Sequence, residues 1–319
     1  MATTSHVDHV FAAVSNKQAA AINPIAASWR RSIVAHGLSP ETTDANRARL
    51  TSREIGEVIG QRAAFVRVAQ PRLEALYGAV GASGFCVALT DESGVILARR
   101  SSSADKDHFD RVGLRTGFEW SEAAQGTNGI GTCLYERRPV VVHRNEHFMS
   151  CYTGLSCIDA PVFGAHGELI GALDVSGNRL DHSSDLNKVI SLSVSQFAGQ
   201  IEADVFADVF SGNRIVVAGS DPSSGQALLA VDESDIVIGA TRAARARYDL
   251  GTTPTLAPIP LNDLLYGDGA SGGFDRSEKM VIRRALVRAN GNASEAAKAL
   301  GISRATLYRR MNKLGLDRS

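Results

Sequence analysis

The polar side chains between residues 303 and 313 have the chemistry that binding to nucleic acid requires. A guanidinium or ammonium group pairs with phosphate, and a guanidinium can donate two hydrogen bonds to the edge of one guanine. Hydroxyl groups contact phosphates or bases. The candidate residues are Ser303, Arg304, Thr306, Tyr308, Arg309, Arg310 and Lys313. Arg304 comes first among the cations, and we expect it to make the guanine contact.

Three predicted helices must position these side chains. The first runs from about residue 276 to Asn290-Gly291, which stops it. The second begins at Ser294, which we expect to be its N-cap, and ends at Gly301. The third spans Arg304 to Leu314 and places three apolar residues on one face, namely Leu307, Met311 and Leu314.

The spacing of small and apolar residues indicates that the last two helices cross at a sharp angle. Such a crossing needs a small residue, then a glycine at the turn, then an apolar anchor. Ala297, Gly301 and Leu307 meet these needs in register. Ser303 is then the expected cap of the last helix. A charged helix that only coats the surface is the alternative interpretation.

The positive charge of the chain is concentrated in the same segment. Residues 275–319 contain 11 Lys and Arg against 4 Asp and Glu, a net charge of +7, whereas the remainder contains 23 against 30, a net charge of −7. The two values sum to the formal net charge of 0. A basic module of this kind is predicted to neutralise phosphates, so its affinity should fall steeply as the salt concentration rises.

These helices resemble the Fis-type helix-turn-helix. The resemblance rests on residues 290–297, Asn-Gly-Asn-Ala-Ser-Glu-Ala-Ala, and on residues 300–310. It implies that the start of the last helix enters the major groove of double-stranded DNA, and that Asn292 and Ser294 touch the DNA backbone. Tyr308 stands where Fis-like proteins often carry a charged or polar residue.

Composition and cysteine spacing restrict the class of protein. At 319 residues with 44% hydrophobic content, the chain has room for about two domains with ordinary cores. No stretch approaches the ~20 uncharged apolar residues that a membrane helix needs, and the N-terminus does not resemble a secretory signal. We therefore expect a cytoplasmic protein with no membrane partner. Its 4 cysteines lack C-x-x-C spacing and are expected to be reduced thiols.

Hydrophobic patterning predicts an α+β fold at residues 56–210. A helical segment is expected before it, at residues 1–55, and Trp29 is the expected packing anchor of this segment. A long helix at residues 57–80 is expected to be interrupted or kinked at Pro71. The other predicted elements are two hairpins (85–90 with 95–98, and 158–163 with 168–175), an edge strand (139–143), a short helix (128–136) and a long closing helix (183–210).

Motifs in this region resemble the GAF sensory domain of acetoin-type catabolic regulators, over roughly residues 20–205. They are residues 113–122, 126–132, 147–148, 156–161 and 171–174. The resemblance implies an antiparallel sheet with flanking helices that binds a small-molecule effector. The ligand-binding candidates are Trp120, Asn128, Ile130, Cys133, Phe148 and Cys157.

Two features of this predicted site have alternative interpretations. The loop 126–131 enters a helix, and its free backbone N–H groups could meet a polar or anionic ligand. Its glycines could equally serve only a tight turn. Trp120 and Phe148 could cover a pocket for a small organic ligand, or they could be ordinary packed core.

The histidines and cysteines of the region also admit other interpretations. His143, His147 and Cys151 recur every four residues, which on one helix would suit a metal, but residues 139–143 are predicted as a strand, so we expect no metal site. Cys133, Cys151 and Cys157 could act as a redox or iron sensor, or as thiols of a methionine sulfoxide reductase of GAF fold. No matched cysteine spacing supports that enzyme, and we predict neither catalysis nor a cofactor.

Two smaller segments separate this region from the basic helices. Residues 211–251 contain three predicted short strands and a helix, and part of the segment resembles the start of a PAS domain. We interpret it as a truncated PAS-like α/β segment, with a disordered linker as the alternative. Residues 252–274 are rich in Pro, Gly, Ser and Asp and are predicted to be a flexible linker before the DNA-binding module at residues 275–319.

The ATPase that acetoin-type regulators carry between sensor and helices is missing. It needs a G-x-x-x-x-G-K-[ST] loop to hold phosphates, and no Gly-Lys dipeptide occurs in the chain. The sequence therefore predicts a ligand-responsive transcription regulator that acts by binding DNA, as a repressor, as an activator contacting RNA polymerase, or as a modulator of full-length relatives. We expect a homodimer, because one small module seldom gives enough specificity. An architectural protein that bends DNA without sensing is the alternative.

Overall fold

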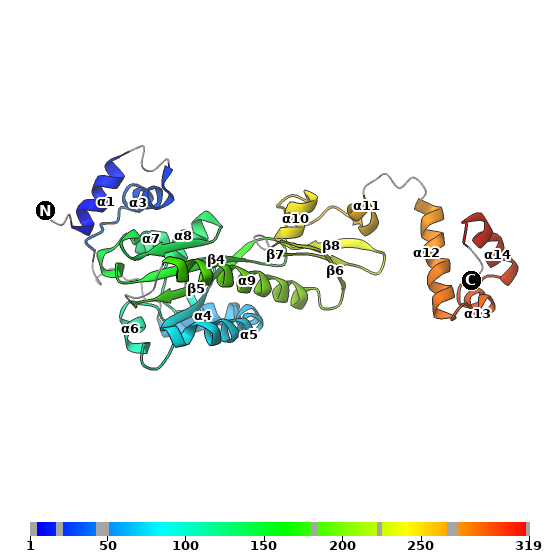
Figure 1. The fold of residues 1–319 in the computed structure, drawn as a ribbon, viewed down its shortest axis with the longest axis horizontal. Coiled ribbons are helices and arrows are strands. Elements are labelled where there is room, and N and C mark those ends of the chain that lie inside the picture. Colours follow the sequence, from blue (N-terminus) through cyan, green and yellow to red (C-terminus); the bar gives the residue numbers. More distant parts are fainter. Residues whose placement is uncertain are drawn as a thin grey trace. The chain divides into compact units, whose positions relative to one another are not determined.

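The computed structural model describes residues 5–16, 22–42, 51–179, 184–221, 225–266 and 273–316. Contacts divide the chain into two compact units, residues 1–258 and residues 259–319, which we describe separately. The first unit is mixed α/β with antiparallel sheets, and the second ends in three helices (Figure 1). The predicted α+β class is confirmed at this level.

A five-stranded antiparallel sheet forms the centre of the first unit, in the strand order β2-β1-β5-β4-β3. Its strands are β1 (Phe85–Thr90), β2 (Ile96–Arg100), β3 (Val140–His143), β4 (Ser156–Phe163) and β5 (Leu169–Gly177). β1 pairs with β2 and β4 pairs with β5, so both predicted hairpins are confirmed. β3 lies at the end of the order beside β4, as expected for an edge strand.

The two faces of this sheet pack against different helices, because side chains alternate along each strand. One face packs against α5 (Ala63–Val80) and α9 (Ser184–Val209), and the other packs against α8 (Gly129–Glu136) (Figure 1). Strand residues in the core on the α5 and α9 side include Val87, Leu89, Ile158 and Leu173. Those on the α8 side include Cys86, Ala88, Cys157 and Ala172. The sheet is thus covered on both faces.

The helix predicted at residues 57–80 is in fact two helices, and the interruption is not at Pro71. α4 (Ser52–Gln61) ends before Arg62, whose φ of −102° and ψ of 10° are not helical, and α5 then continues through Pro71. Gly60 weakens the end of α4, whereas a proline removes only one backbone donor from a long, packed helix. α4 also spans the predicted domain boundary between residues 55 and 56.

Two N-terminal helices, α1 (His6–Ser15) and α3 (Pro24–Val34), join the core on the α8 side of the sheet. Trp29 is the predicted packing anchor: it is 4% exposed, and its Nε1 donates a hydrogen bond to the carbonyl oxygen of Glu146 at 2.8 Å. The imidazole of His9 meets the Trp29 ring edge-on, with the ring centroids 5.5 Å apart. The role expected for Trp29 is confirmed.

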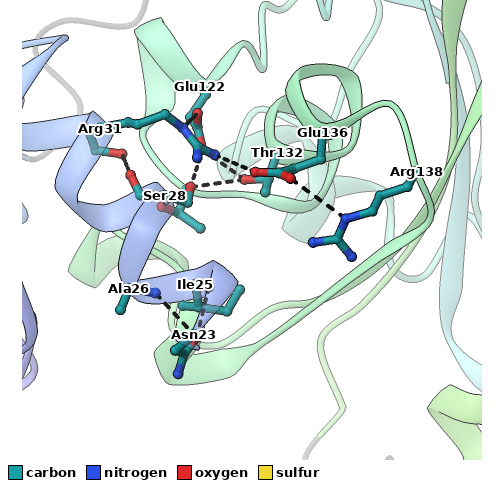
Figure 2. Close-up of polar contacts among 11 residues, drawn as sticks. Asn23, Ile25, Ala26, Ser28, Arg31, Glu122, Thr132, Glu136 and Arg138 are labelled. Carbon is teal, nitrogen blue, oxygen red and sulfur yellow. Dashed lines mark hydrogen bonds and ion pairs between the residues drawn. The ribbon is translucent and has the colours of Figure 1, made fainter. Parts of the chain in front are cut away.

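A buried carboxylate fastens α3 to the rest of the first unit (Figure 2). Glu122, at the start of the short helix α7 (Glu122–Gln125), is 4% exposed and accepts a hydrogen bond from Nε of Arg31 at 2.9 Å and another from the Ser28 hydroxyl. Arg31 also forms an ion pair with Glu136 at 3.1 Å. Because these groups are paired with one another, Glu122 tolerates a degree of burial that an isolated carboxylate would not.

Shorter helical elements lie beside the strands of the first sheet. The 3-10 turn η2 (Gly81–Ser83) joins α5 to β1, α6 (Lys106–Arg111) follows β2, and the 3-10 turns η3 (Arg144–Glu146) and η4 (Ser150–Tyr152) lie between β3 and β4. No helix among the described residues is long and apolar enough to cross a membrane.

A second antiparallel sheet follows α9 in the first unit. It contains β6 (Arg214–Asp221), β7 (Gly225–Val231) and β8 (Ile236–Ala240), paired in that order, and α10 (Arg242–Tyr248) comes next. These are the three strands and the helix predicted within residues 211–251. The alternative of a disordered linker at this position is therefore wrong.

The interval predicted as a flexible linker, residues 252–274, contains ordered structure. The Arg245 guanidinium of α10 donates to the carbonyl oxygens of Thr253 at 2.7 Å and Pro254 at 3.0 Å. In the second unit, β9 (Ile259–Pro260) and α11 (Leu261–Tyr266) precede residues 267–272, which lie outside the described residues. The proline and glycine content of the interval predicted a linker. Instead, hydrogen bonds from Arg245 order its first residues, and the leucines of α11 belong to a regular helix.

Three helices complete the second unit: α12 (Gly273–Arg288), α13 (Ala293–Ala299) and α14 (Arg304–Lys313). Their core includes Ile282, Ala296, Ala297, Leu307 and Met311. Ala297 is 2% exposed and Leu307 is 0% exposed, as the predicted crossing of the last two helices requires.

Replacing Glu122 by glutamine should destabilise the first unit. The amide leaves Arg31 with Glu136 as its remaining acidic partner and removes the anionic acceptor of Ser28. Loss of one partner of a buried pair costs about 3–5 kcal/mol. The Arg31 side chain is 20% exposed, so we expect a value at the lower end. Urea denaturation followed by circular dichroism measures the loss as a lower midpoint for Glu122→Gln.

Asp185→Asn is the matched control for this experiment. It neutralises one side of the ion pair between Asp185 and Lys188, whose side chains are 86% and 76% exposed. Exposed pairs contribute about 0–1 kcal/mol, so the midpoint should change little. Equal shifts for the two variants would show that Glu122 does not hold α3 in place.

Candidate nucleic-acid interface and buried polar core

Asn292, rather than Ser294, is the N-cap of α13. Its Oδ1 accepts hydrogen bonds from the backbone N–H groups of Ser294 at 3.0 Å and Glu295 at 3.4 Å. The prediction of Ser294 as the cap was wrong because both side chains favour caps, and the helix starts at the earlier one. Ser294 therefore lies in the first turn of α13.

The turn into α14 and the cap of that helix are as predicted. Gly301 has a φ of +64°, a left-handed conformation that favours glycine, between α13 and α14. Ser303 then caps α14, and its hydroxyl oxygen accepts a hydrogen bond from the N–H of Thr306 at 3.1 Å. Leu307 and Met311 are buried, and Leu314 is half-buried. Turn, cap and core together fix the direction of the first turn of α14.

Tyr308 contacts Arg304 on the outer side of α14. Nη2 of Arg304 donates to the Tyr308 hydroxyl at 3.4 Å, and the guanidinium carbon lies 5.5 Å from the centroid of the ring. Arg304 and Arg309 are both exposed, and neither forms an ion pair within the ranges that the structure covers. These two guanidinium groups are therefore available to an anionic or hydrogen-bonding partner.

Arg310 and Lys313 are paired with carboxylates of α12 in the same unit. Arg310 forms an ion pair with Glu278, and Lys313 forms one with Asp275 at 3.1 Å. The pair between Lys313 and Asp275 is exposed and contributes little stability, and both pairs compensate the positive charge locally. The predicted DNA-binding residues of α14 thus differ in electrostatic state, with Arg304 and Arg309 carrying the uncompensated charge.

Alanine substitution at the two candidate caps should separate their roles. Asn292→Ala removes both cap hydrogen bonds and is expected to cost about 1 kcal/mol of stability. Ser294→Ala keeps the cap and should change stability by less than about 0.5 kcal/mol. Thermal unfolding of the full chain, followed by circular dichroism, measures both. A larger loss for Ser294→Ala would restore Ser294 as the N-cap.

The residues predicted to bind a ligand lie in one buried region on the α8 side of the first sheet. Each is at most 3% exposed: Trp120, Asn128, Ile130, Cys133, Phe148 and Cys157. Nε1 of Trp120 donates to the carbonyl oxygen of Gly113 at 3.0 Å, and its ring centroid lies 4.8 Å from that of Tyr152. Trp120 and Phe148 both belong to the packed core. A surface pocket of about 920 Å³ is lined by other residues, including Glu92, Glu122, Tyr135, Arg137 and Glu168.

The loop before α8 packs against protein atoms. Asn128 caps α8, and its Oδ1 accepts a hydrogen bond from an N–H of the first turn at 2.8 Å. Gly126 has a φ of +65°, and an added Cβ there would lie 2.4 Å from the Phe148 ring. At Gly129 an added Cβ would lie 1.9 Å from Oδ2 of Asp159. The glycines thus serve a tight turn and a close approach, and the start of α8 faces Asp159.

Two buried carboxyl groups, Asp159 in β4 and Asp174 in β5, were not among the predicted site residues. The strand register places them opposite each other, and they are 1% and 0% exposed. Burial first, and then the neighbouring Asp174, raise the pKa of Asp159 well above its usual range. Burial also raises the pKa of Asp174 to about 7. The sequence signal for both is an aspartate in the middle of an otherwise apolar strand.

Hydroxyl, thiol and imidazole side chains surround this carboxyl pair. The Ser176 hydroxyl lies 2.8 Å from Oδ1 of Asp174 and 3.1 Å from Sγ of Cys157. Nε2 of His147 lies 3.3 Å from the same sulfur. Burial lowers the pKa of His147 to about 4, so this imidazole is neutral near pH 7. Burial raises the pKa of the Cys133 and Cys157 thiols, which therefore stay protonated.

The histidines and cysteine with four-residue spacing lie on separate elements. His143 ends β3, His147 follows η3, and Cys151 is in η4. Because these elements are a strand and two short turns, the spacing does not bring the three side chains to one helix face. Across the residues that the structure describes, no group of three or more His, Cys, Asp or Glu side chains could hold a metal ion.

Cys151 should be the thiol that reacts quickly in the folded protein. Cys86, Cys133 and Cys157 are buried, whereas Cys151 is exposed. Since the thiolate is the reactive form, the buried thiols should react slowly until the protein unfolds. Reaction with dithiobis(nitrobenzoic acid) measures this, and Cys151→Ser should remove the fast phase. Fast alkylation of native Cys157, identified by peptide mass analysis, would instead favour a redox sensor.

Two protein-family models match this chain. Residues 274–314 match the bacterial regulatory protein Fis family, and residues 9–201 match the N-terminal domain of MimR. In fold, the chain is similar to the E. coli protein in the crystal structure of the DhaR(N)-DhaL complex, with a TM-score of 0.53, 15% sequence identity, and coverage of 73% of this chain and 79% of that chain.

Three curated relatives are transcriptional regulators by name. The acetoin catabolism regulatory protein of Cupriavidus necator is 30% identical over 233 residues, which cover 71% of this chain and 35% of that protein. The acetoin dehydrogenase operon transcriptional activator AcoR of Bacillus subtilis is 31% identical over 127 residues, or 40% and 21% of the two chains. The propane 2-monooxygenase operon transcriptional activator MimR of Mycolicibacterium smegmatis is 35% identical over 77 residues, or 24% and 13%. The matches span about a third or less of each relative's length.

Proposed function

Because the chain belongs to the MimR N-terminal domain family and carries a Fis-family segment at residues 274–314, we propose that it is a ligand-responsive, DNA-binding transcription regulator. The observation that carries the proposal is the second unit, where a capped helix after a glycine turn presents Arg304 and Arg309 outward. The activity is binding rather than catalysis. The reductase alternative is not favoured, because the Cys133 and Cys157 thiols are buried and protonated.

Double-stranded DNA is the proposed partner of α14. The start of the helix lies in the major groove, where Arg304, supported by its contact with Tyr308, donates two hydrogen bonds to a guanine. Ser303 and Thr306 flank this contact, and Arg309 binds phosphate. Asn292 and Ser294, at the start of α13, contact the DNA backbone. Arg310 and Lys313 contribute less to affinity, because Glu278 and Asp275 compensate their charges.

The first unit is the proposed sensor. It is GAF-like in its five-stranded sheet, with β6, β7, β8 and α10 as a truncated PAS-like extension. The similarity in fold to DhaR(N) and the six predicted ligand residues, gathered in one buried region, support this proposal. The names of the relatives refer to acetoin and to a propane monooxygenase operon, so the proposed effector is a small organic compound.

Regulation would proceed without ATP hydrolysis. The chain contains no Gly-Lys dipeptide, and residues 206–275 hold the end of α9, the second sheet, α10 and α11. Effector binding would therefore change DNA occupancy or a direct contact with RNA polymerase. The sign of regulation follows from where the protein sits on its operator.

A homodimer is the proposed active form. α9 exposes Val189 at 62% and Leu192 at 75%, two apolar side chains one helical turn apart on its outer side. Two copies would present two α14 helices to two DNA half-sites, which doubles the base contacts available to one module. RNA polymerase remains a further proposed partner for an activator of this type.

Arg304→Ala should weaken sequence-selective binding more than general binding. On the DNA upstream of its own gene, the full-length variant should lose about 1–3 kcal/mol of affinity, and on scrambled DNA it should lose little. Arg309→Ala should weaken both DNAs alike and lower the slope of log affinity against log salt by about 1. Fluorescence anisotropy at two salt concentrations measures both variants beside the wild type.

Three outcomes would change the interpretation. Equal losses for Arg304→Ala on both DNAs would remove Arg304 from base reading. Salt-sensitive binding of the wild type without any sequence preference, both with and without added small organic compounds, would favour the architectural alternative. Absence of DNA binding under all these conditions would contradict the proposed function.

A further inference from the structure

Three carboxylate oxygens in the core of the first unit have no hydrogen-bond partner outside their own pair. They are Oδ1 and Oδ2 of Asp159 and Oδ2 of Asp174, in residues that are 1% and 0% exposed. The register of β4 and β5 sets the two residues opposite each other. Asp159 lies two residues after Cys157, and Asp174 lies two residues after Ala172, so both carboxyl groups share the α8-side face with these core residues.

This arrangement does not favour folding. A buried polar group without a partner costs about 1–3 kcal/mol, and two adjacent carboxyl groups repel each other unless they share a proton. Well-packed apolar residues at the same positions would avoid both costs. The pair therefore has unsatisfied hydrogen-bonding capacity that a bound molecule can satisfy.

The residues around the pair resemble the lining of a small-molecule site, which is mostly apolar with a few polar groups. Small side chains dominate the neighbouring strand positions on this face: Cys86, Ala88, Ala172 and Ser176. Larger apolar and aromatic residues complete the same core cluster: Trp120, Ile130, Phe148 and Tyr152. Gly129 lets the start of α8 approach Asp159 closely. The sensor candidates predicted from sequence thus lie in the same buried region as the carboxyl pair.

We propose that Asp159 and Asp174 bind the effector, and that this effector is a small uncharged molecule with at least one hydroxyl group. The inference rests on the proposed function, since it assigns the sensing site of that regulator. The unpartnered oxygens are acceptors, so the ligand must supply a donor, and a carboxylate ligand would be repelled.

The protonation state of the pair lowers its negative charge, so its ligand need not be a cation. Burial raises the pKa of both groups, so the pair retains a proton near neutral pH. With the proton shared between the two carboxyl groups, the remaining oxygens accept a hydrogen bond, and a hydroxyl group of the ligand can donate it. The sulfur of Cys157 and the neutral imidazole of His147 add no charge to this region.

A four-carbon series on the full-length protein tests the proposal. The probes are 3-hydroxybutan-2-one, butan-2-one, butanoate and butylammonium, which differ in the hydroxyl group or in charge. Isothermal titration calorimetry should show binding of 3-hydroxybutan-2-one at least about 10-fold tighter than that of butan-2-one, since an unpaired buried acceptor costs about 1–3 kcal/mol. Tighter binding of butylammonium or butanoate, or no discrimination by the hydroxyl, would overturn the proposal.

Isosteric variants locate the binding. Asp159→Asn and Asp174→Asn should each weaken 3-hydroxybutan-2-one binding at least about 10-fold. Glu202→Gln is the matched control, because Glu202 is a buried carboxyl on α9 whose pKa burial raises to about 7, and it lies outside the pair. Its variant should bind like the wild type. An equal loss in Glu202→Gln would show a general effect on the fold and would overturn the assignment.

An infrared measurement on the wild-type protein does not depend on variants that fold. Addition of 3-hydroxybutan-2-one should shift the carbonyl stretch of a protonated carboxyl group, and no shift under saturating binding would exclude the pair as the site. Anisotropy on upstream DNA separates this inference from the proposed function. Selective DNA binding together with no binding of the four probes in calorimetry overturns the inference alone, whereas absence of selective DNA binding, with and without the probes, overturns the proposed function.

Discussion

The pairing of β4 with β5 is the constraint on which the rest of the first unit depends. Both strands are largely buried, and their ladder joins β3 on one side to β1 on the other. The register that directs Ile158 and Val175 toward α5 and α9 must also set Asp159 opposite Asp174 on the α8 side. A shift by one residue would exchange the two faces and turn a carboxyl group toward α5 and α9. The polar pair is therefore a consequence of the same register that builds the core.

Helix α8 links the pairing of β4 with β5 to the N-terminal helix α3 through an unbroken series of residue contacts. At its start, Gly129 meets Asp159, and in its first turns the Thr132 hydroxyl donates to Glu122 at 3.2 Å. Glu122 in turn holds Arg31 of α3 (Figure 2). Such a contiguous chain of packed and hydrogen-bonded groups is what energetic coupling between a core site and a surface helix requires. A small displacement of α8 by a molecule bound at the carboxyl pair would reach α3 through these groups.

Local sequence signals predicted most helices, strands and turns. The features that the sequence did not predict depend on contacts between distant residues or on small differences between neighbouring ones. The cap at Ser303, the turn at Gly301 and the strand at residues 85–90 depend on neighbouring residues only, and these predictions were confirmed. The choice between Asn292 and Ser294 as cap, and the break at Arg62, depend on small differences between similar local options. The pairing of Asp159 with Asp174 depends on the register of two strands, which no local pattern encodes. Packed core was the alternative interpretation of Trp120 and Phe148 in the sequence, but the partners of these side chains were not predicted.

The energetic scale of the proposed regulation follows from the lack of an ATPase sequence. In the proposed regulation without ATP hydrolysis, the effector would shift DNA occupancy only by the difference between its affinities for the two states of the protein. One hydroxyl group satisfied by a buried carboxyl pair supplies about 1–3 kcal/mol. That is the usual range of coupling free energies, roughly 5- to 150-fold in affinity. In the proposed homodimer each copy would bind its own effector and the two contributions would add, so one hydroxyl group per subunit would be sufficient for the proposed regulation.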